Sequence, residues 1–548
     1  MALPHWTRTG HIGGRVYTRA LGLNELGFYY DSHINGTADT LTHNTIQVSA
    51  EGQRCFAPDN IVRAWCALKT QFPLLAAAVQ MHHSHQHFVV AEERLRSIVP
   101  NELSVSSVSS LEEAQAAAID GRDGERKLSD NLLCRIVILS RTDDSSTYHV
   151  LINVAHLIVD GVGTIVLLRA FLDMLSSSPD GNPGPDLEAR LSLAVAAESL
   201  VPTLNMSVAR QRWRRAAGHI ISQIQDAKRT GGQTLPRFFG PIATRLPARS
   251  GLLSILLSPA ESLRITQNLR KNHITMGNSL PVLAQVSLSR LLCRRYVRNE
   301  ISTEEWQFRK KEPYHTAGPI NLRPFLDKTW YDGGGHSNVS VNIGYFYFTL
   351  GFTPLGPANL APGDSVPEFS ELMSPKRFLL RCNQMKTLAS RYLKHPLFFE
   401  IGAARLAGKI EMQKTVAAKW GNNSKSFVRS GEVEENNVSP AEQAERGAVH
   451  AHGWSTYGGM GGPLPREYPS QNAGSSNPPL LRLQSSQQLL HCRTGELYLG
   501  AGGSSEQLSL VLYWDKNVYS PEIVQEWVDE TARAMNYYLG SGEALAKL

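Results

Sequence analysis

Apolar residues follow two different spacings along this chain, and the change from one to the other is clearest at residues 147–175. Thr147–Val154 is rich in β-branched and aromatic residues, the composition of a buried strand. Beyond Gly161, apolar residues recur at the spacing of one helix face, at Val162, Ile165, Val166, Leu168, Phe171, Leu172 and Leu175. The sequence therefore predicts a strand, a short turn that can face a cavity, and a helix.

The same two patterns continue through the rest of the chain. Strands are predicted at Leu41–Val48, Leu132–Leu139, Leu252–Leu257, Asn338–Leu350, Leu497–Leu499 and Leu508–Trp514. Helices are predicted at Pro58–Thr70, Glu112–Ala118, Ser279–Val297, Pro375–Leu393 and Pro396–Ala418. Ser258–Glu261 reads as a capping box with proline at the first helical position. Strands that alternate with helices in this way predict an α/β fold.

The chain is long enough for two lobes. At 548 residues it exceeds what one simple core accommodates. Ser176–Asp186 is rich in Ser, Pro, Gly and Asp and is the clearest linker. We therefore expect a first lobe at residues 1–180, a connector at 181–248 and a second lobe at 249–548. The polar, acidic segment Ser430–Gly447 is expected to be a mobile insertion.

Composition argues against several classes of protein. The net charge of +6 is spread without long basic runs, unlike that of a dedicated nucleic-acid binder, but it leaves room for a local site for a phosphorylated ligand. The six cysteines are scattered without a C-x-x-C, so a zinc or redox motif is not expected. No signal-peptide core and no run of about 18 apolar residues is present, which predicts a cytoplasmic protein without a membrane span.

Two polar clusters have alternative interpretations. The segment M-H-H-S-H-Q-H, residues 81–87, places alternate histidines on one strand face, as a metal site would. Because no Cys or Asp stands nearby to complete a ligand set, we favour a solvated hairpin edge and expect no metal. The segment R-Q-R-W-R-R, residues 210–215, is either a phosphate patch or a solvated helix face, and we favour the helix face.

The turn after Thr147–Val154 carries the pattern H-x-x-x-D-G at His156, Asp160 and Gly161. Histidine is the natural general base near neutral pH, because its ordinary pKa is about 6.5. It can take a proton from an alcohol or amine that attacks a carbonyl. Asp160 can contact the imidazole directly, or it can point away, pair with an arginine and hold the loop in shape. The spacing alone leaves both roles of Asp160 open.

This H-x-x-x-D-G element after a strand resembles the active-site motif of an acyltransferase superfamily. The superfamily includes chloramphenicol acetyltransferase, peptide-synthetase condensation domains, plant-type BAHD enzymes and fungal alcohol acetyltransferases. Condensation domains usually carry a second histidine before the motif, where this chain has Ala155, and the BAHD string D-F-G-W-G is absent. The spacing of Arg19, Leu21 and Glu25 resembles the opening of condensation-type enzymes. The chain looks most like the trichothecene 15-O-acetyltransferase and alcohol acetyltransferase branch.

The resemblance implies two chloramphenicol-acetyltransferase-like α/β lobes, each a mixed sheet with flanking helices, and an active-site tunnel between them. His156 would be the general base, midway along the tunnel. Arg323, in the segment G-P-I-N-L-R-P-F, would lie on a strand and pair with Asp160. The charge argument agrees, because a carboxylate beside a cavity needs a partner or it costs stability.

The residues implied to bind the substrates lie in the second lobe. Ser455 and Thr456, in G-W-S-T-Y-G-G-M, would face the tunnel, and one of them would donate a hydrogen bond to the oxyanion. Asn321 would also contact substrate. Acyl-CoA would be a co-substrate, with no permanently bound cofactor, and would enter on the second-lobe side. Lys409 and Lys414 lie with Arg405 in a cationic cluster that would bind its phosphates, unless this is a solvated helix face.

The implied function is transfer of an acyl group, acetyl by the resemblance, from coenzyme A to a hydroxyl of a small secondary metabolite, by a monomer. Two alternatives are a carrier-protein-dependent condensation or cyclisation enzyme, and a non-catalytic binding protein with the same fold. Ala155 and the lack of an adjoining carrier domain weigh against the first. His156, Asp160, Gly161 and Arg323 together weigh against the second. The sequence leaves the acceptor alcohol and the acyl chain open.

Overall fold

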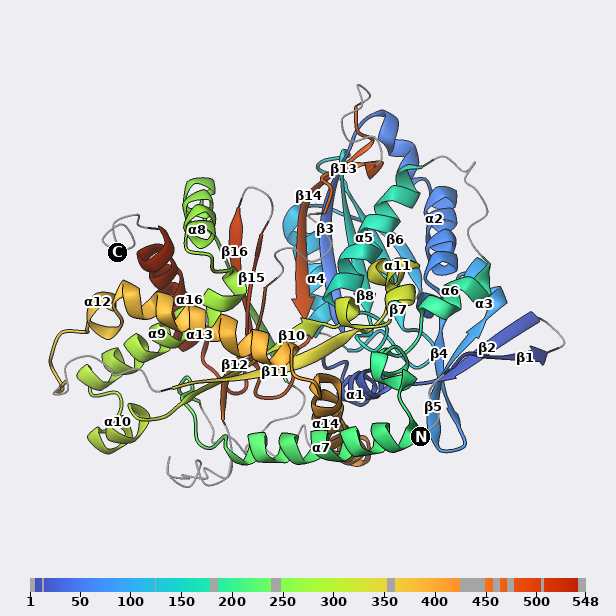
Figure 1. Cartoon of the computed structure of the whole chain (residues 1–548). Coiled ribbons are helices and arrows are strands. Elements are labelled where there is room, and N and C mark those ends of the chain that lie inside the picture. The colour runs from blue at the N-terminus through green and yellow to red at the C-terminus, as the bar shows by residue number, and fades with distance from the viewer. Residues whose placement is uncertain are drawn as a thin grey trace.

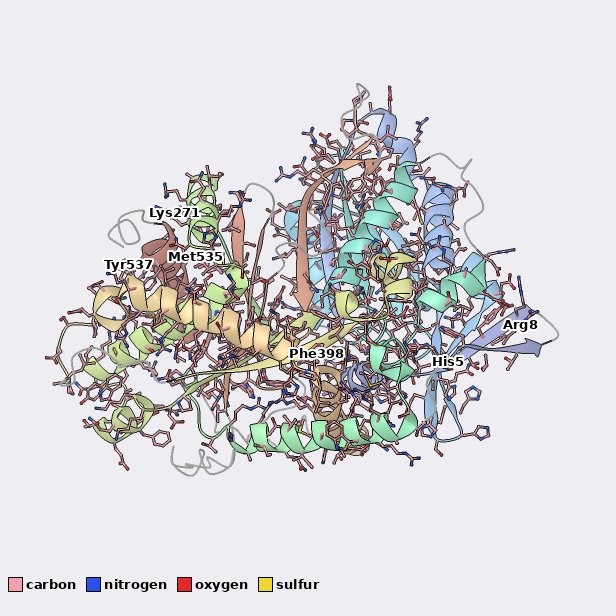
Figure 2. All side chains as sticks on the ribbon, in the orientation of Figure 1. His5, Arg8, Lys271, Phe398, Met535 and Tyr537 are labelled. Atoms are coloured by element: carbon pink, nitrogen blue, oxygen red, sulfur yellow. The ribbon has the colours of Figure 1, made fainter. Side chains whose placement is uncertain are left out.

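The structure is a computed structural model that describes residues 5–11, 14–123, 125–177, 186–237, 248–351, 360–423, 449–456, 464–470, 478–503 and 507–540. Two six-stranded sheets, each packed against helices, lie side by side and form two lobes (Figure 1). A separate four-stranded sheet extends from the first lobe (Figure 1). Side chains fill the space between sheets and helices in both lobes (Figure 2). The predicted α/β fold with two sheet-containing lobes is confirmed.

The sheet of the first lobe has the strand order β13-β14-β3-β8-β7-β6. Its β6 and β7 are parallel, and the other neighbouring strands are antiparallel. The strands are β3 (Thr40–Val48), β6 (Leu103–Val108), β7 (Cys134–Arg141), β8 (Thr147–Val154), β13 (Glu467–Tyr468) and β14 (Leu481–Leu490). The strand predicted at 147–154 is therefore β8, and it lies at the centre of the sheet.

Helices cover both faces of the first-lobe sheet. The helices α2 (Pro58–Gln71) and α5 (Gly161–Ser176) pack on one face, and α4 (Leu111–Asp123) packs on the other. Trp65 of α2 and Phe171 of α5 are fully buried and meet edge to face, with ring centroids 6.3 Å apart. Burial of a large apolar side chain stabilises the fold by roughly 1.5–3 kcal/mol. The apolar positions at helical spacing in 162–175 thus form the buried face of α5.

The histidine-rich segment is a hairpin in the four-stranded sheet, whose order is β1-β2-β5-β4. Strands β4 (Ala78–His82) and β5 (His85–Ala91) pair antiparallel, with His82 opposite His85. The side chains of residues 82–85 are exposed, as expected for a solvated hairpin edge. The other elements here are β1 (Thr7–His11), β2 (Gly14–Ala20) and α3 (Glu92–Arg96).

The sheet of the second lobe has the order β11-β10-β12-β15-β16-β9. Strand β12 is parallel to both of its neighbours, and the other pairs are antiparallel. The strands are β9 (Ser250–Leu256), β10 (Tyr314–Asn321), β11 (Ile343–Leu350), β12 (His450–Thr456), β15 (Leu497–Gly503) and β16 (Leu508–Asp515). The strand predicted at 338–350 begins only at Ile343, because residues 338–342 bond to Arg323 and Asp160 instead of to a neighbouring strand.

Helix α9 (Met276–Val297) and helix α16 (Pro521–Met535) pack together in the second-lobe core. Glu530 of α16 is fully buried and accepts hydrogen bonds from Arg290 and Arg294 of α9, which supplies the counter-charge that a buried carboxylate needs. Ser258 and Glu261 form the predicted capping box at the start of α8 (Pro259–Lys271). The helices that follow α9 along the chain are α10 (Thr303–Arg309), α11 (Lys328–Asp332), α12 (Phe369–Leu372) and α13 (Pro375–Leu393).

Three helices run across the junction of the lobes: α1 (Leu23–Ser32), α7 (Val208–Ala227) and α14 (Phe398–Asn423). Helix α14 packs against both α1 and α7, as seen along the lower edge of Figure 1. Arg214 of α7 donates to Glu400 of α14 over 2.6 Å, so one arginine of the R-Q-R-W-R-R run is buried in an ion pair. Arg210, Arg212 and Arg215 are exposed, as on a solvated helix face. Helix α6 (Leu187–Leu193) precedes α7.

The predicted boundary of the second lobe at residues 249–548 does not describe the sheets correctly. Strands β13 and β14 come from this part of the chain but belong to the first-lobe sheet, where β14 pairs with β3 along its whole length. Leu481, Leu483 and Leu489 bury their side chains there. The alternating pattern of β14 predicts a strand, but it does not say which of two sheets has a free edge for it.

The segment predicted to be a mobile insertion, Ser430–Gly447, lies outside the described residues. So does most of the predicted linker, Ser176–Asp186. Within the described ranges, no helix is long and apolar enough to cross a membrane. All six cysteines are free thiols.

A buried histidine pair lies between strands β3 and β8. His43 Nε2 and His149 Nδ1 are 3.0 Å apart, and His149 is completely buried. Burial, reinforced by the neighbouring His43, lowers the pKa of His149 from 6.5 to about 4, and burial also lowers the pKa of His43. Both rings are therefore neutral in the folded protein at neutral pH.

We predict that acid destabilises the protein through this pair. Above pH 6.5 His149 is neutral in both states and does not affect folding. As the pH falls from 6.5 towards 4, the unfolded chain takes up a proton that the folded protein excludes, which lowers the free energy of unfolding by up to about 1.4 kcal/mol per pH unit. Thermal unfolding of the wild type and His149→Gln between pH 7 and 4.5 checks this. Equal acid sensitivity of the two proteins would contradict it.

Candidate active-site cavity

His156 lies in the turn between β8 and α5, with its ring open to a cavity. The neighbouring residues Leu157, Ile158 and Val159 are buried and anchor the turn in the first-lobe core. The imidazole stacks on Phe28 of α1, with ring centroids 3.9 Å apart and an interplanar angle of 4°. Its Nδ1 atom is buried, which leaves Nε2 as the nitrogen available to a ligand.

The imidazole is neutral at neutral pH. Burial lowers the pKa of His156 to about 4, and the nearby cation Arg493 lowers it further, whereas Asp160 acts weakly in the opposite direction. A neutral imidazole can accept a proton, so His156 has the protonation state that a general base requires.

Asp160 points away from the imidazole and holds the turn. It is 1% exposed and caps helix α5, with Oδ1 accepting from the backbone N–H of Gly163 at 2.9 Å. Its Oδ2 accepts from Arg323 Nη1 at 2.7 Å and from the backbone N–H of Asn342 at 2.8 Å. Both carboxylate oxygens are thus engaged. The sequence left two roles open for Asp160. The structure shows the second of them, in which Asp160 points away from the imidazole and pairs with an arginine.

Arg323 connects the two lobes, because it belongs to the second lobe and pairs with Asp160 of the first. Its Nη2 donates to the backbone carbonyls of Asn338 and Ser340 at 3.2 and 3.0 Å, and the side chain is 1% exposed. The prediction that Arg323 lies on a strand is wrong, because β10 ends at Asn321 and Arg323 begins a 3₁₀ turn. That turn lets the guanidinium leave the plane of the sheet and reach Asp160. Asn321 Oδ1 accepts from the backbone N–H of Arg323 at 3.1 Å, and Asn321 lines the cavity.

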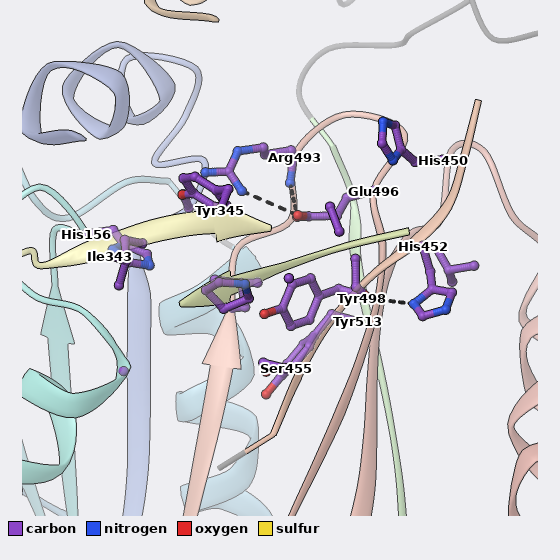
Figure 3. A pocket seen from close by; sticks show the side chains of 18 of the residues that line it. His156, Ile343, Tyr345, His450, His452, Ser455, Arg493, Glu496, Tyr498 and Tyr513 are labelled. Carbon is purple, nitrogen blue, oxygen red and sulfur yellow. Dashed lines mark hydrogen bonds and ion pairs between the residues drawn. The ribbon is translucent and has the colours of Figure 1, made fainter. Parts of the chain in front are cut away.

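The cavity has a volume of about 620 Å³ and lies between the lobes. The first lobe contributes Phe28, His156, Asp160 and Gly161, the first residue of α5. The second lobe contributes most of the wall, including Tyr345, His450, His452, Ser455, Tyr498 and Tyr513. Figure 3 shows His156 next to Ile343 on one side of this space, and Tyr498, Tyr513 and His452 towards the other. A cavity of this size accommodates a small organic ligand.

Only one of the two predicted hydroxyl donors faces the cavity. Ser455 lines it, is 5% exposed, and has an Oγ without a hydrogen-bond partner among the described residues. Thr456 faces the other side of β12, with its Oγ1 next to Gly277 of helix α9. The prediction that both face the tunnel is wrong for Thr456, because successive side chains on a strand point to opposite faces. Tyr457, the next residue along the chain, lies outside the described residues.

The cationic cluster predicted on α14 does not exist as one group. Lys414 is exposed to solvent, and it does not line the cavity that contains His156. Lys409 points inward and lines the cavity, with Nζ 4.9 Å from the centroid of the Tyr345 ring. Arg405, one turn before Lys409, donates to Gln225 of α7. On a helix, residues four apart share a face whereas residues five apart do not, which separates Lys414 from the other two.

Two residues that lie near His156 were not predicted from the sequence. They are Phe28 and Arg493. Arg493 donates through Nε to Asp31 at 2.8 Å and through Nη1 to Glu496 at 3.4 Å, the latter drawn as a dashed line in Figure 3. Its guanidinium lies 5.6 Å from the centroid of the Phe28 ring. These contacts join residues far apart in sequence, so no local pattern marks them. An arginine three residues after the apolar end of β14 is the one signal that the sequence offers.

Helix α1 positions Phe28 and Asp31, and a buried ion pair fixes that helix. Arg19 of β2 donates two hydrogen bonds to the carboxylate of Glu25, at 2.8 and 2.7 Å, and both side chains are almost fully buried. Bidentate Arg–carboxylate pairs have strict geometry. The R-x-L-x-x-x-E spacing therefore serves to set the position of α1 against the active site.

Solved structures with this fold include the trichothecene 15-O-acetyltransferase TRI3 from Fusarium sporotrichioides, with a TM-score of 0.65 and 14% identity over 97% of this chain and 98% of that chain. The condensation domain of the Monacolin K polyketide synthase MokA has a TM-score of 0.58 and 9% identity, over 96% of this chain and 98% of that one. A mutant starter condensation domain of the rhizomide synthetase RzmA in complex with C8-CoA has a TM-score of 0.57 and 10% identity, over 96% and 95%. No protein-family model matches the sequence, and no curated protein does.

The likeness to these structures covers almost the whole of each chain, but few residues are identical. It therefore shows a shared fold. The predicted two-lobed fold of the chloramphenicol acetyltransferase and condensation-domain type is confirmed.

We predict that Asp160→Asn lowers the free energy of unfolding by roughly 3–5 kcal/mol, because it leaves the buried Arg323 charged and unpaired. Chemical denaturation of the purified proteins measures the effect. The double variant Asp160→Asn, Arg323→Met should recover part of the loss, since it removes the unpaired charge. Additive losses in the double variant would contradict the predicted coupling.

Proposed function

We propose that this protein transfers an acyl group, acetyl in the simplest case, from a coenzyme A thioester to a hydroxyl of a small secondary metabolite. The observation that carries the proposal is a neutral imidazole, His156, open to a cavity of about 620 Å³ between the lobes. The fold shared with the acetyltransferase TRI3, and with a condensation domain solved with C8-CoA, supports the choice of reaction and donor.

His156 acts first as the base. Its Nε2 accepts the proton of the acceptor hydroxyl as the oxygen attacks the thioester carbonyl carbon. The carbonyl oxygen becomes the oxyanion of a tetrahedral intermediate. The carbon–sulfur bond then breaks, the carbonyl re-forms as an ester, and the imidazolium gives its proton to the departing thiolate. The proton therefore passes from the alcohol to coenzyme A, and no acyl-enzyme is needed.

Ser455 and Asp160 support this chemistry in different ways. The Ser455 hydroxyl faces the cavity and has no hydrogen-bond partner among the described residues, so it is available to donate to the oxyanion. Asp160 does not touch the reacting atoms. It positions His156 by holding the turn against Arg323.

A carrier-bound thioester is the alternative donor, because condensation domains share this fold. The two donors differ only beyond the pantetheine arm, so the same cavity chemistry would serve both. Incubation with acetyl-CoA and a panel of alcohols, followed by mass spectrometry of the products, tests the proposal. Ester formation with free acetyl-CoA supports it. Transfer only from a carrier-bound acyl group would favour the alternative, and binding of acetyl-CoA without any turnover would favour a non-catalytic role.

We predict that His156→Ala reduces turnover by roughly 10²–10⁴-fold, the usual contribution of a general base. Folding should be retained, because the ring faces a cavity and its Nδ1 has no hydrogen-bond partner among the described residues. Circular dichroism and donor binding provide the control. Near-normal turnover in a well-folded His156→Ala protein would rule out this mechanism.

We also predict that Ser455→Ala lowers kcat by roughly 10²–10³-fold with little change in the donor KM, because an oxyanion donor acts mainly in the transition state. Thr456→Val is the matched control on the same strand. Its side chain faces α9, so its effect on kcat should be small. A larger loss in Thr456→Val than in Ser455→Ala would contradict the assignment.

A further inference from the structure

Lys409 places an ammonium group inside the cavity system. It lies on the inward face of α14, above the ring of Tyr345, and lines both the main cavity and a second, smaller cavity behind β11. Burial lowers its pKa to about 8, and the neighbouring Arg493 lowers it further. The Lys409 side chain is half-buried in the cavity wall, and its ammonium group is mainly protonated at neutral pH.

This ammonium lacks a counter-ion within the described part of the chain. The carboxylates that act on it electrostatically, Asp31 and Glu496, both bind Arg493 instead. The Tyr345 ring supplies only a cation–π contact. A half-buried cation without an anionic partner costs free energy. A negatively charged group on a ligand would remove that cost, whereas a neutral ligand would not.

The second cavity is mainly apolar and adjoins Lys409. It has a volume of about 90 Å³, and most of its wall is formed by apolar side chains such as Leu322, Phe398 and Leu406. Its polar lining includes Asn24, Arg405 and Glu198, whose Oε1 accepts from the backbone N–H of Leu23. Phe398, labelled in Figure 2, lies at the start of α14. Ile343, Tyr345, Tyr347 and Lys409 line both cavities, so Lys409 lies where the two adjoin. A dry cavity of about 150 Å³ holds a benzene molecule, so this space suits a small apolar group.

Lys409 and His156 line the same cavity of about 620 Å³. Phe28 stacks on His156, the Arg493 guanidinium lies 5.6 Å from the Phe28 ring, and Arg493 acts in turn on Lys409. In a coenzyme A thioester, the uncharged pantetheine arm separates the reacting carbonyl from the phosphates. The phosphates of the donor thus lie a full pantetheine arm away from the thioester, whereas an anion on the acceptor or on the acyl group lies within the cavity that Lys409 lines.

We propose that Lys409 binds a carboxylate carried by one of the two substrates, with an apolar part of the same molecule in the adjoining cavity of about 90 Å³. The substrate class is then a hydroxylated organic acid, or a dicarboxylic acyl thioester such as malonyl-CoA. This inference rests on the proposed function, because it takes the cavity to be the site of acyl transfer.

Ligand binding to the His156→Ala protein tests the inference without turnover. The acceptor arm compares straight-chain ω-hydroxy acids with their methyl esters, and the donor arm compares malonyl-CoA with acetyl-CoA, both by calorimetry. In one arm the acid should bind roughly 10- to 100-fold more tightly than its neutral counterpart, the usual contribution of a charge-assisted hydrogen bond. The arm that shows the preference identifies the substrate that carries the carboxylate.

Variants of α14 assign the preference to Lys409. Lys409→Met should abolish the preference, and Lys409→Arg should keep much of it. Lys414→Met removes the same charge from the solvent face of the same helix and should leave the preference intact. The inference is overturned if no acid in either arm binds more tightly than its neutral counterpart. It is also overturned if Lys409→Met keeps the preference, or if Lys414→Met removes it as fully. None of these outcomes depends on acyl transfer, so the proposed function stands or fails separately.

Discussion

The buried ion pair between Asp160 and Arg323 is the constraint on which the site depends. One carboxylate starts helix α5, ends the turn that carries His156, and accepts from two segments of the second lobe. A buried carboxylate is stable only when its oxygens have partners, and here three donors satisfy it. The position of the imidazole in the first lobe is therefore coupled directly to the wall of the second lobe.

The second half of the chain also contributes residues directly to the first lobe. Strand β14 leaves the second half of the chain to extend the first-lobe sheet, and Val339 and Val341 insert into the first-lobe core. Helix α14, from the second half of the chain, packs on α1 from the first half. Because the cavity lies between parts that cross over in this way, its walls move little relative to one another without breaking core contacts.

Three basic side chains of the cavity differ in charge and in partners. His156 is neutral, Arg493 is paired with carboxylates, and Lys409 has no carboxylate partner within the described residues. Arg493 is held by Asp31 and Glu496, so it favours the neutral form of His156 without leaving a buried charge unpaired. Lys409 has no such partner within the described residues and faces the open space. The difference between these two cations follows from their neighbours, since both are basic side chains in the same cavity. If the cavity is the site of the proposed acyl transfer, this arrangement would distinguish ligands by their charge.

The sequence by itself determined the local elements and their chemistry. The apolar spacing defined β8 and α5, and the residue types in the turn between them identified a histidine base and a carboxylate that needs a partner. Tertiary structure decided which sheet β14 joins, that Thr456 faces α9, that Lys409 and Lys414 lie on different faces of α14, and that Phe28 and Arg493 flank the imidazole. The physical reason is that hydrophobic periodicity reports which face of an element is buried, but not against what. Contacts between residues hundreds of positions apart leave no local pattern to read.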